Sequence, residues 1–370
     1  MPRNAPITTL VLQGGGALGA YQAGAATALA AAGHSPGWVA GISIGAINAA
    51  LICGNPPERR EARLAAFWEQ VSASLPAPPA RNLPDILRLG YENAAAAAVV
   101  ASGVPGFFRP RWPWPPGLLP ADSIYTSGPL RVTLEELADF DWLNDHGPRL
   151  SVGAVDLETG NFAYFDSARQ TIGPEHVMAS GALPPGLPPV EVEGRLWWDG
   201  GLVSNTPLQY VLEHHDDRPM TIFQADLFSA RGQRPKTLGE VESRRKDIQF
   251  SSRTRLTTDR YRELHKLAAA ARRLRARLPE TMRGDPDLDR LCRAAPSAPV
   301  DLVHLIHRRA AFETDAKDYD FSRLSMLQHW EAGARDVGQS LADPRWQARG
   351  RHEGLRVFDL TNPERKEPQT

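Results

Sequence analysis

The chain contains few cysteines and almost no excess charge of either sign. Cys53 and Cys292 are too few for a disulfide framework and are typical of a reducing compartment. Lysine and arginine together number 42, against 43 aspartates and glutamates, so the formal net charge is -1. A chain without a positive excess has no overall attraction to nucleic acid. We therefore expect a cytoplasmic protein without a nucleic-acid partner.

Charged side chains are missing from most of the N-terminal region. No Asp, Glu, Lys or Arg lies between Arg3 and Glu58. A membrane span is one explanation, but glycines and a proline interrupt the run, and neither a basic leader segment nor an A-x-A cleavage site is present. Buried parallel strands and the helices that cover them leave the same lack of charge. This second explanation predicts a soluble α/β protein.

Strand-like and helix-like segments alternate along the first 57 residues. An apolar run ends at Leu12, and after several glycines an alanine-rich helix is expected from Ala17 to Ala32. A second strand-like run, WVAGIS at 38–43, leads into a helix-like run that ends before Gly54. This alternation predicts a parallel α/β sheet. Further strands are predicted at 149–157, 162–167 and 220–228, proline-rich loops at 72–84 and 103–120, and an arginine-rich helical region beyond 231.

The glycines after the first strand resemble a nucleotide-binding loop. Gly14, Gly16 and Gly19 satisfy G-x-G-x-x-G. A dinucleotide site of that type also needs an acidic residue about 20 residues further on, to bind the ribose hydroxyls. The first acidic residue is Glu58, and no G-K-[ST] follows the glycines. A nucleotide-binding oxidoreductase is therefore disfavoured, and the loop needs another explanation.

A candidate nucleophile follows the second predicted strand. The stretch GISIG, residues 41–45, is a G-x-S-x-G sequence between a strand and a helix, which is the context of a nucleophile elbow. Gly41 and Gly45 leave room around Ser43 in so tight a turn. A serine that attacks a carbonyl needs backbone N–H donors for the oxyanion. Residues 14–16 follow the neighbouring strand and are expected to supply them.

A candidate base lies in LWWDGGLVSNTPL, residues 196–208. Asp199 follows a bulky apolar run and precedes Gly200 and Gly201, which places a carboxylate at a strand end. The alternative is an ordinary Asp-Gly hairpin turn. An α/β-hydrolase would place its serine after several strands and supply a histidine later in the chain. Here the serine follows the second strand, and the ten histidines lie in no catalytic motif.

Taken together and in this order, GGGALG (14–19), GISIG (41–45) and DGG (199–201) resemble the patatin-like phospholipase family. The proline-rich ASGALPPGLPPV at 179–190 adds to the resemblance, which covers residues 7–228. It implies a three-layer α/β/α fold with a mainly parallel central sheet. Residues 231–370 resemble the mainly helical, arginine-rich extension of some bacterial members.

The resemblance also implies a set of site residues. Ser43 would be the nucleophile and Asp199 its base, as a dyad without histidine. Gly14, Gly15 and Gly16 would line the oxyanion hole, and Gly19, Gly41, Gly45, Gly200 and Gly201 would complete the motifs. The family often carries Arg or Lys before the last glycine of the loop, where this chain has Leu18.

The implied activity is hydrolysis of acyl esters of lipids through an acyl-enzyme. No cofactor is implied, and no metal, because no cluster of His, Cys and Asp shows ligand spacing. Two alternatives stay open at this point. The substrate is another acyl ester, such as a neutral lipid, a thioester or a storage polyester, or the protein binds lipid without catalysis.

Two further segments have a composition that suits lipid contact. Residues 243–278 hold twelve Lys or Arg against three acidic residues, and apolar residues recur there at helical spacing. Such a helix either docks on its own domain or attaches reversibly to an anionic membrane, so a peripheral location at the membrane is the alternative to a purely cytoplasmic one. The aromatic loop from Val104 to Leu119 either covers the acyl cleft, touches lipid or packs on the core.

Overall fold

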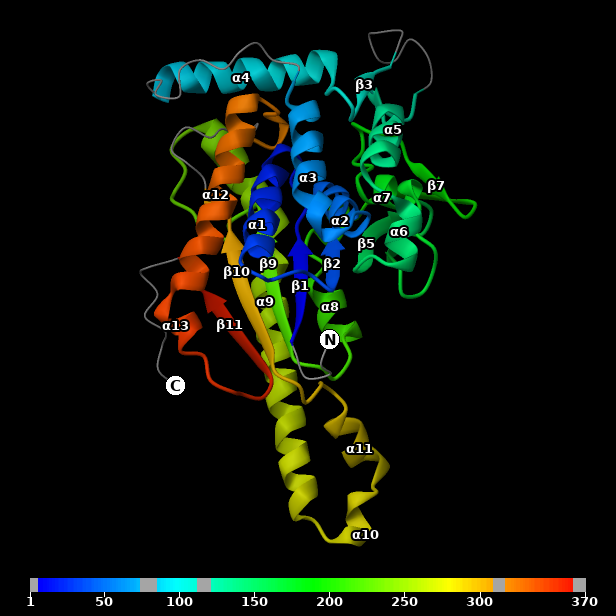
Figure 1. Cartoon of the computed structure of the whole chain (residues 1–370), viewed down its shortest axis with the longest axis vertical. Helices are drawn as coiled ribbons and strands as arrows, with labels where there is room; N and C mark the ends of the chain where they lie inside the picture. Colours follow the sequence, from blue (N-terminus) through cyan, green and yellow to red (C-terminus); the bar gives the residue numbers. More distant parts are fainter. Residues whose placement is uncertain (1–5, 74–84, 112–120, 309–316, 362–370) are drawn as a thin grey trace.

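The computed structural model describes residues 6–73, 85–111, 121–308 and 317–361, which build one central sheet with helices on both faces (Figure 1). Within these residues the sheet has nine strands in the order β11-β10-β9-β1-β2-β5-β8-β7, and β6 also pairs with β5. The strands from β11 to β5 in this order are parallel, and β6, β7 and β8 are antiparallel to their partners. Their bounds are β1 (Ile7–Leu12), β2 (Trp38–Gly41), β5 (Arg149–Asp156), β6 (Phe162–Asp166), β7 (Val190–Val192), β8 (Arg195–Asp199), β9 (Met220–Asp226), β10 (Val300–Ile306) and β11 (Leu355–Asp359), and a separate ribbon pairs β3 (Arg109–Pro110) with β4 (Tyr125–Thr126).

Alternating side chains of the parallel strands enter two hydrophobic clusters. In β1, Leu10 and Leu12 belong to one cluster and Val11 to the other. In β10, Val303 belongs to the first and Leu302 to the second. Successive residues of a strand point to opposite faces, so two clusters mean that both faces of the sheet are covered. The expected three-layer α/β/α fold is confirmed.

The helices divide between the two faces of the sheet. In Figure 1, α1, α2, α3 and α12 lie on one face, and α8 and the upper part of α9 lie behind the strands. The lower part of α9, with α10 and α11, projects beyond the sheet. No helix of the described residues combines the length and apolarity needed to cross a bilayer. The bounds are α1 (Gly19–Ala31), α2 (Ile44–Cys53), α3 (Pro57–Val71), α4 (Asp85–Ser102), α5 (Gly128–Leu137), α6 (Phe140–Asp145), α7 (Pro174–Ser180), α8 (Leu208–His214), α9 (Leu238–Arg277), α10 (Glu280–Arg283), α11 (Pro286–Cys292), α12 (Arg323–Ala342) and α13 (Pro344–Gln347), with short 3-10 helices η1 (Gly16–Leu18), η2 (Gly200–Leu202) and η3 (Lys317–Tyr319).

Most predicted elements occur close to their expected positions. The strands expected at 149–157, 162–167 and 220–228 are β5, β6 and β9, and β5 and β6 form a hairpin. The first helix begins at Gly19 rather than Ala17, because Gly16–Leu18 forms the 3-10 turn η1. Strands β10 and β11 were not predicted, since each is a short apolar run within a charged region of the sequence.

The C-terminal region is mainly helical, as expected, but it also contributes to the central sheet. Strand β10 pairs in parallel with β9, and β11 pairs with β10. Helix α12 packs on α1 at backbone distance: a Cβ at Gly24 would lie 2.0 Å from the Trp330 carbonyl oxygen, and one at Gly333 would lie 2.0 Å from the Tyr21 carbonyl oxygen. The predicted boundary between residues 228 and 231 therefore divides two regions that share one sheet.

Two crossed ion pairs attach η3 to helix α9. Lys317 Nζ lies 2.9 Å from Asp247 Oδ1, and both residues are buried. Lys246 Nζ lies 2.9 Å from Asp318 Oδ1, with about a fifth of each side chain exposed (24% and 18%). In each element a lysine directly precedes an aspartate, and each lysine pairs with the aspartate of the other element. This arrangement fixes η3 in register on α9.

The two pairs should differ in their effect on stability. Lys317→Met leaves the Asp247 carboxylate buried without its partner, which should lower the free energy of unfolding by about 3 to 5 kcal/mol. Lys246→Met, the matched control, removes a partly exposed pair and should cost about 1 kcal/mol. Urea titrations of both variants measure the difference. Equal losses would contradict the buried pairing of Lys317.

Candidate active site

The register of the first two strands places the glycine loop beside Ser43. Leu12, the last residue of β1, is level with Gly41, the last residue of β2, and the two strands are parallel. Both chains therefore leave the sheet at the same edge. The segment 13–18 turns there into α1, and residues 42–43 turn into α2. Two helix N-termini consequently point at one place, where their backbone N–H groups favour negative charge.

Ser43 lies on a strained turn between β2 and α2. Its φ and ψ are 55° and -124°, a region that residues with a side chain rarely adopt. The turn is tight enough that a Cβ at Gly41 would lie 2.3 Å from the Gly45 carbonyl oxygen, and one at Gly45 would lie 2.4 Å from the Leu12 carbonyl oxygen. Glycine is thus required on both sides of the serine. The predicted strand-turn-helix context of Ser43 is present.

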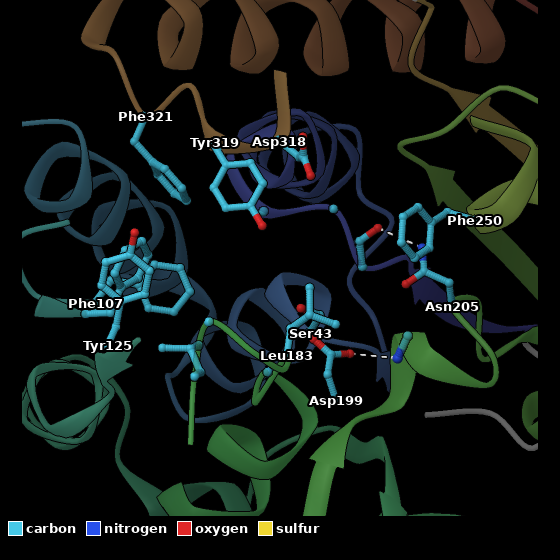
Figure 2. Close-up of a pocket in the computed structure, with 18 of the residues that line it drawn as sticks. Ser43, Phe107, Tyr125, Leu183, Asp199, Asn205, Phe250, Asp318, Tyr319 and Phe321 are labelled. Atoms are coloured by element: carbon cyan, nitrogen blue, oxygen red, sulfur yellow. Dashed lines mark hydrogen bonds between the residues drawn. The ribbon is translucent and has the colours of Figure 1, made fainter. Parts of the chain in front are cut away.

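Asp199 reaches the same edge from β8. Strand β5 lies between β2 and β8, where Val152 is level with Gly41 and Ala154 is level with Asp199. Ser43, two residues beyond Gly41, is therefore close to the level of Asp199. The two side chains lie next to each other in Figure 2, and hydrogen bonding by the Ser43 hydroxyl is among the effects that lower the pKa of Asp199. The predicted serine and aspartate are brought together.

The Asp199 carboxyl group is deeply buried. Only 2% of the residue is exposed, and burial raises the pKa of Asp199 to about 7. Hydrogen bonds from the Gly201 N–H, 2.6 Å from Oδ1, and from the Ser43 hydroxyl lower this pKa but do not offset the burial. A carboxylate with a pKa near neutrality is a stronger base than an exposed aspartate. The Asp199 environment therefore suits proton transfer from Ser43.

The glycine loop offers backbone donors on the other side of Ser43. The Gly14 N–H donates to the Asn205 carbonyl oxygen at 3.2 Å, and Asn205 Nδ2 donates to the Gly14 carbonyl oxygen at 2.9 Å. In the described part of the chain, the N–H groups of Gly15 and Gly16 have no such acceptor. Gly16 has φ +56°, and a Cβ there would lie 2.2 Å from the Asp318 carbonyl oxygen. Gly14, Gly15 and Gly16 all line the cavity. Among the described residues, the backbone N–H groups of Gly15 and Gly16 are therefore free to donate to a bound group.

The other motif glycines are positions of close packing. A Cβ at Gly19 would lie 2.5 Å from Ile44 Cγ1, and one at Gly200 would lie 2.5 Å from the Gly153 carbonyl oxygen. Gly201 donates to Asp199, as described above. The first contact holds the glycine loop against the start of α2, and the second holds the turn after Asp199 against β5.

Polar residues that the sequence analysis did not single out support the site. The Ser180 hydroxyl accepts from the Ser43 N–H at 3.1 Å. Gln13 is fully buried, and its Oε1 accepts from the N–H groups of Leu227 and Phe228, so it ties the glycine loop to the end of β9. Gln13 directly precedes the glycine loop and Asn205 lies four residues after Gly201, so polar residues beside these motifs were an available signal.

A cavity of about 120 Å³ opens over Ser43 and Asp199. Its walls are largely aromatic and come from segments far apart in the chain, and no histidine lines it in the described residues. No group of three or more possible metal ligands occurs among those residues either. The lining residues besides Ser43, Asp199 and the loop glycines are Phe107, Phe108, Tyr125, Gly181, Leu183, Gly186, Leu187, Gly201, Asn205, Phe228, Phe250, Asp318, Tyr319 and Phe321.

Two segments noted in the sequence contribute to the wall of this cavity. Residues 181–187 belong to the proline-rich approach to Asp199 and form one side of the cavity. From the aromatic loop at 104–119, Phe107 and Phe108 line the cavity, whereas Trp112 and Trp114 lie outside the described residues. No sequence motif marks the three C-terminal residues of the wall, Asp318, Tyr319 and Phe321. They lie far from Ser43 in the sequence and come close to it only in the folded chain.

Comparison with protein families agrees with this geometry. A family model described as patatin-like phospholipase matches residues 10–212, which is more than half of the chain. The chain belongs to the patatin-like phospholipase family. A second model, described as patatin phospholipase, matches residues 248–353, so the family likeness extends into the C-terminal region. No curated protein sequence matches the chain.

Two solved structures have a low overall similarity to this chain. VipD from Legionella pneumophila is 15% identical, with a TM-score of 0.33 over 89% of this chain and 67% of that one. The ExoU–SpcU complex from the type III secretion system of Pseudomonas aeruginosa gives 15% identity and a TM-score of 0.30 over 79% of this chain and 60% of that one. Neither likeness carries a functional argument.

The Asp199 pKa predicts how the reactivity of Ser43 depends on pH. If Asp199 is the base, it can accept the serine proton only when it is ionised; because burial has raised its pKa, the reactive fraction should fall about tenfold per pH unit below about 7. The rate of covalent labelling of Ser43 by a fluorophosphonate, measured between pH 5 and 9, checks this. Asp199→Asn is the control and should remove the pH step. A flat wild-type profile down to pH 5 would contradict it.

Proposed function

We propose that this protein is a serine acyl hydrolase that cleaves acyl esters of lipids with a Ser43–Asp199 dyad. The observation that carries the proposal is one site: a serine on a strained turn lies next to a buried carboxylate, in an apolar cavity that the glycines with free backbone donors also line. Membership of the patatin-like phospholipase family supports lipid hydrolysis as the activity class.

In the first half of the reaction, Asp199 takes the proton of the Ser43 hydroxyl while the serine oxygen attacks the ester carbonyl carbon. The carbonyl oxygen gains negative charge, which the N–H groups of Gly15 and Gly16 and the helix N-termini stabilise. The intermediate then collapses as the bond between the carbonyl carbon and the alcohol oxygen breaks. Asp199 gives its proton to this oxygen, and the neutral alcohol leaves. The acyl group remains on Ser43 as an ester.

In the second half, water takes the place of the alcohol. Asp199 accepts a proton from the water, whose oxygen attacks the acyl-enzyme carbonyl. The same donors stabilise the second oxyanion, and Ser43 leaves with the proton returned by Asp199. The acid product departs and the dyad is restored. Every proton passes through one carboxyl group, which suits a site without a histidine.

Two other functions fit the same fold. The ester could belong to a neutral lipid, a thioester or a storage polyester, since the dyad chemistry is the same for each. The protein could also bind lipid without turnover. Labelling of Ser43 by a fluorophosphonate separates catalysis from binding, because only an activated serine reacts. Labelling at Ser43 supports a hydrolase of some acyl ester.

Ser43 and Asp199 are expected to act as one unit. Ser43→Ala and Asp199→Asn should each lower kcat for ester hydrolysis on the order of a thousandfold or more, and the double variant should be little worse than either. The reason is that neither residue transfers a proton without the other. Steady-state kinetics on one ester, with thermal unfolding to show that each variant folds, measure the effect.

The matched comparison is a buried histidine away from the site. His307 packs against the rings of Tyr21 and His329 and does not line the cavity. Replacing it should leave kcat within about tenfold in protein that still folds. If replacing His307 lowered kcat as much as Asp199→Asn does, the Ser43–Asp199 dyad would be wrong, and a histidine would be the base.

We also propose that the basic helix α9 contacts anionic membrane. Leu267 and Leu274 are 63% and 54% exposed, whereas Tyr261 and Leu264 line a groove beside α8, so part of the predicted apolar face is docked and part is free. Sedimentation with anionic vesicles should show binding at low salt that falls at high salt, with none to neutral vesicles. Binding indifferent to lipid charge and salt would leave only the docked role.

A further inference from the structure

Asn205 holds the glycine loop with one end of its side-chain amide and leaves the other end free. Its Nδ2 donates to the Gly14 carbonyl oxygen at 2.9 Å. Because a carbonyl oxygen only accepts, the end of the amide that faces Gly14 is the nitrogen and the other end is the oxygen. In the part of the chain that the structure describes, no donor reaches Asn205 Oδ1. The amide therefore presents a free hydrogen-bond acceptor.

This free oxygen lies close to both Ser43 and Asp199. A Cβ at Gly14 would lie 2.4 Å from Asn205 Oδ1 and 3.0 Å from Ser43 Cβ. A Cβ at Gly201 would lie 3.0 Å from Asn205 Oδ1 and 3.0 Å from Asp199 Oδ1. Asn205 lines the cavity together with the serine and the aspartate, and in Figure 2 its oxygen is on the side of Ser43. A small molecule at the dyad is thus within reach of this acceptor.

The two halves of the proposed reaction bring different oxygens to this place. In the first half, the alcohol oxygen of the ester carries no hydrogen until Asp199 protonates it, so it has nothing to donate to Asn205. In the second half, the attacking water carries two hydrogens. One of them is transferred to Asp199, and the other is available to a second acceptor. A free acceptor beside the dyad therefore assists the attack of water and not the departure of the alcohol.

A polar cavity beside Asn205 gives water access to this place. It has a volume of about 560 Å³ and shares Gly201, Asn205 and Phe250 with the cavity over Ser43. Gln209 in its lining is exposed, so the cavity reaches the surface. A space of this size with several polar partners holds water. Its polar lining residues besides Asn205 include Ser204, Thr206, Gln209, Gln249 and Thr257.

Resting on the proposed function, we propose that Asn205 is a catalytic residue of the second half of the reaction, in which its Oδ1 positions the attacking water. The water donates one hydrogen bond to Asn205 Oδ1 and one to Asp199. As the water oxygen bonds to the acyl carbon, its proton moves to Asp199. The bond from that carbon to the Ser43 oxygen then breaks, and Ser43 takes the proton from Asp199. The hydrogen that faces Asn205 stays on its oxygen and becomes the hydroxyl hydrogen of the acid product.

The test compares water with an alcohol as the second nucleophile. The full-length protein is given p-nitrophenyl octanoate in water that contains methanol, and the acyl-enzyme is converted either to octanoic acid or to methyl octanoate. Methanol has a single O–H group, which Asp199 takes, so Asn205 assists water alone. Asn205→Leu keeps the size of the side chain and removes the acceptor, and it should raise the ratio of methyl ester to acid about 5- to 10-fold. An unchanged ratio in folded protein would refute the role of Asn205.

The product ratio separates this role from the hold of Asn205 on the glycine loop. Weaker oxyanion donors slow the attack of water and of methanol alike, so their effect cancels in the ratio. Asn205→Asp keeps an oxygen acceptor and loses the donor to Gly14. Its overall rate should fall, while its product ratio stays within about twofold of the wild-type ratio. If this ratio rose as far as in Asn205→Leu, the acceptor would not be the cause.

Gln22→Met is the matched control on the other side of the loop. Gln22 is fully buried and does not line the cavity, and its Nε2 donates to the Gln13 carbonyl oxygen at 2.7 Å, one residue before the carbonyl that Asn205 holds. This variant also loosens the loop, so its turnover is free to fall, but its product ratio should not change. A raised ratio would attribute the effect to the loop. Thermal unfolding shows which variants fold, and Asn205→Ala replaces Asn205→Leu if the latter does not.

Two measurements on the wild-type protein distinguish failure of this proposal from failure of the proposed function. They are hydrolysis of the same ester and fluorophosphonate labelling of Ser43. If both occur and the product ratio of Asn205→Leu is unchanged, the dyad stands and the role of Asn205 is refuted. If neither occurs, the hydrolase and the role of Asn205 are both refuted.

Discussion

The site depends on a steric constraint where β1 and β2 leave the sheet. The Leu12 carbonyl accepts the Ile42 N–H at 3.1 Å, and the Gly45 backbone packs against the same carbonyl with no space for a side chain. This contact forces the chain to turn at Ser43 into a positive φ and to start α2 at once. The serine is exposed to the cavity as a result. Any side chain at residue 45 would separate the serine turn from the glycine loop.

Close to this turn, the carboxyl group of Asp199 is buried, which lowers the stability of the folded protein. Asp199 has no cationic partner among the groups that shift its pKa, and two hydrogen bonds partly stabilise its ionised form. A structural carboxylate at this depth would gain from a lysine or arginine. The absence of that compensation keeps the pKa of Asp199 near neutrality, which is where a base is useful. Stability is thus given up at the residue that we propose as the base.

The C-terminal region completes the cavity over Ser43 as well as the sheet. The Lys317–Asp247 and Lys246–Asp318 pairs hold η3 on α9, and η3 rests against the loop glycine at 16 through the Asp318 backbone. Tyr319 and Phe321 then close the cavity from above in Figure 2. The separate family matches to 10–212 and 248–353 correspond to two regions that build one site.

The sequence by itself determined the local devices: a glycine loop, a serine between two glycines, and an aspartate before two more. Each depends on backbone geometry within a few residues, so residue type and spacing reveal it. Only the tertiary structure decided the approach of Ser43 to Asp199, the burial that raises the Asp199 pKa, the anchoring by Gln13, and the place of Phe321 in the cavity wall. These depend on contacts between residues far apart in the chain, and no local pattern records which distant segments will pack together.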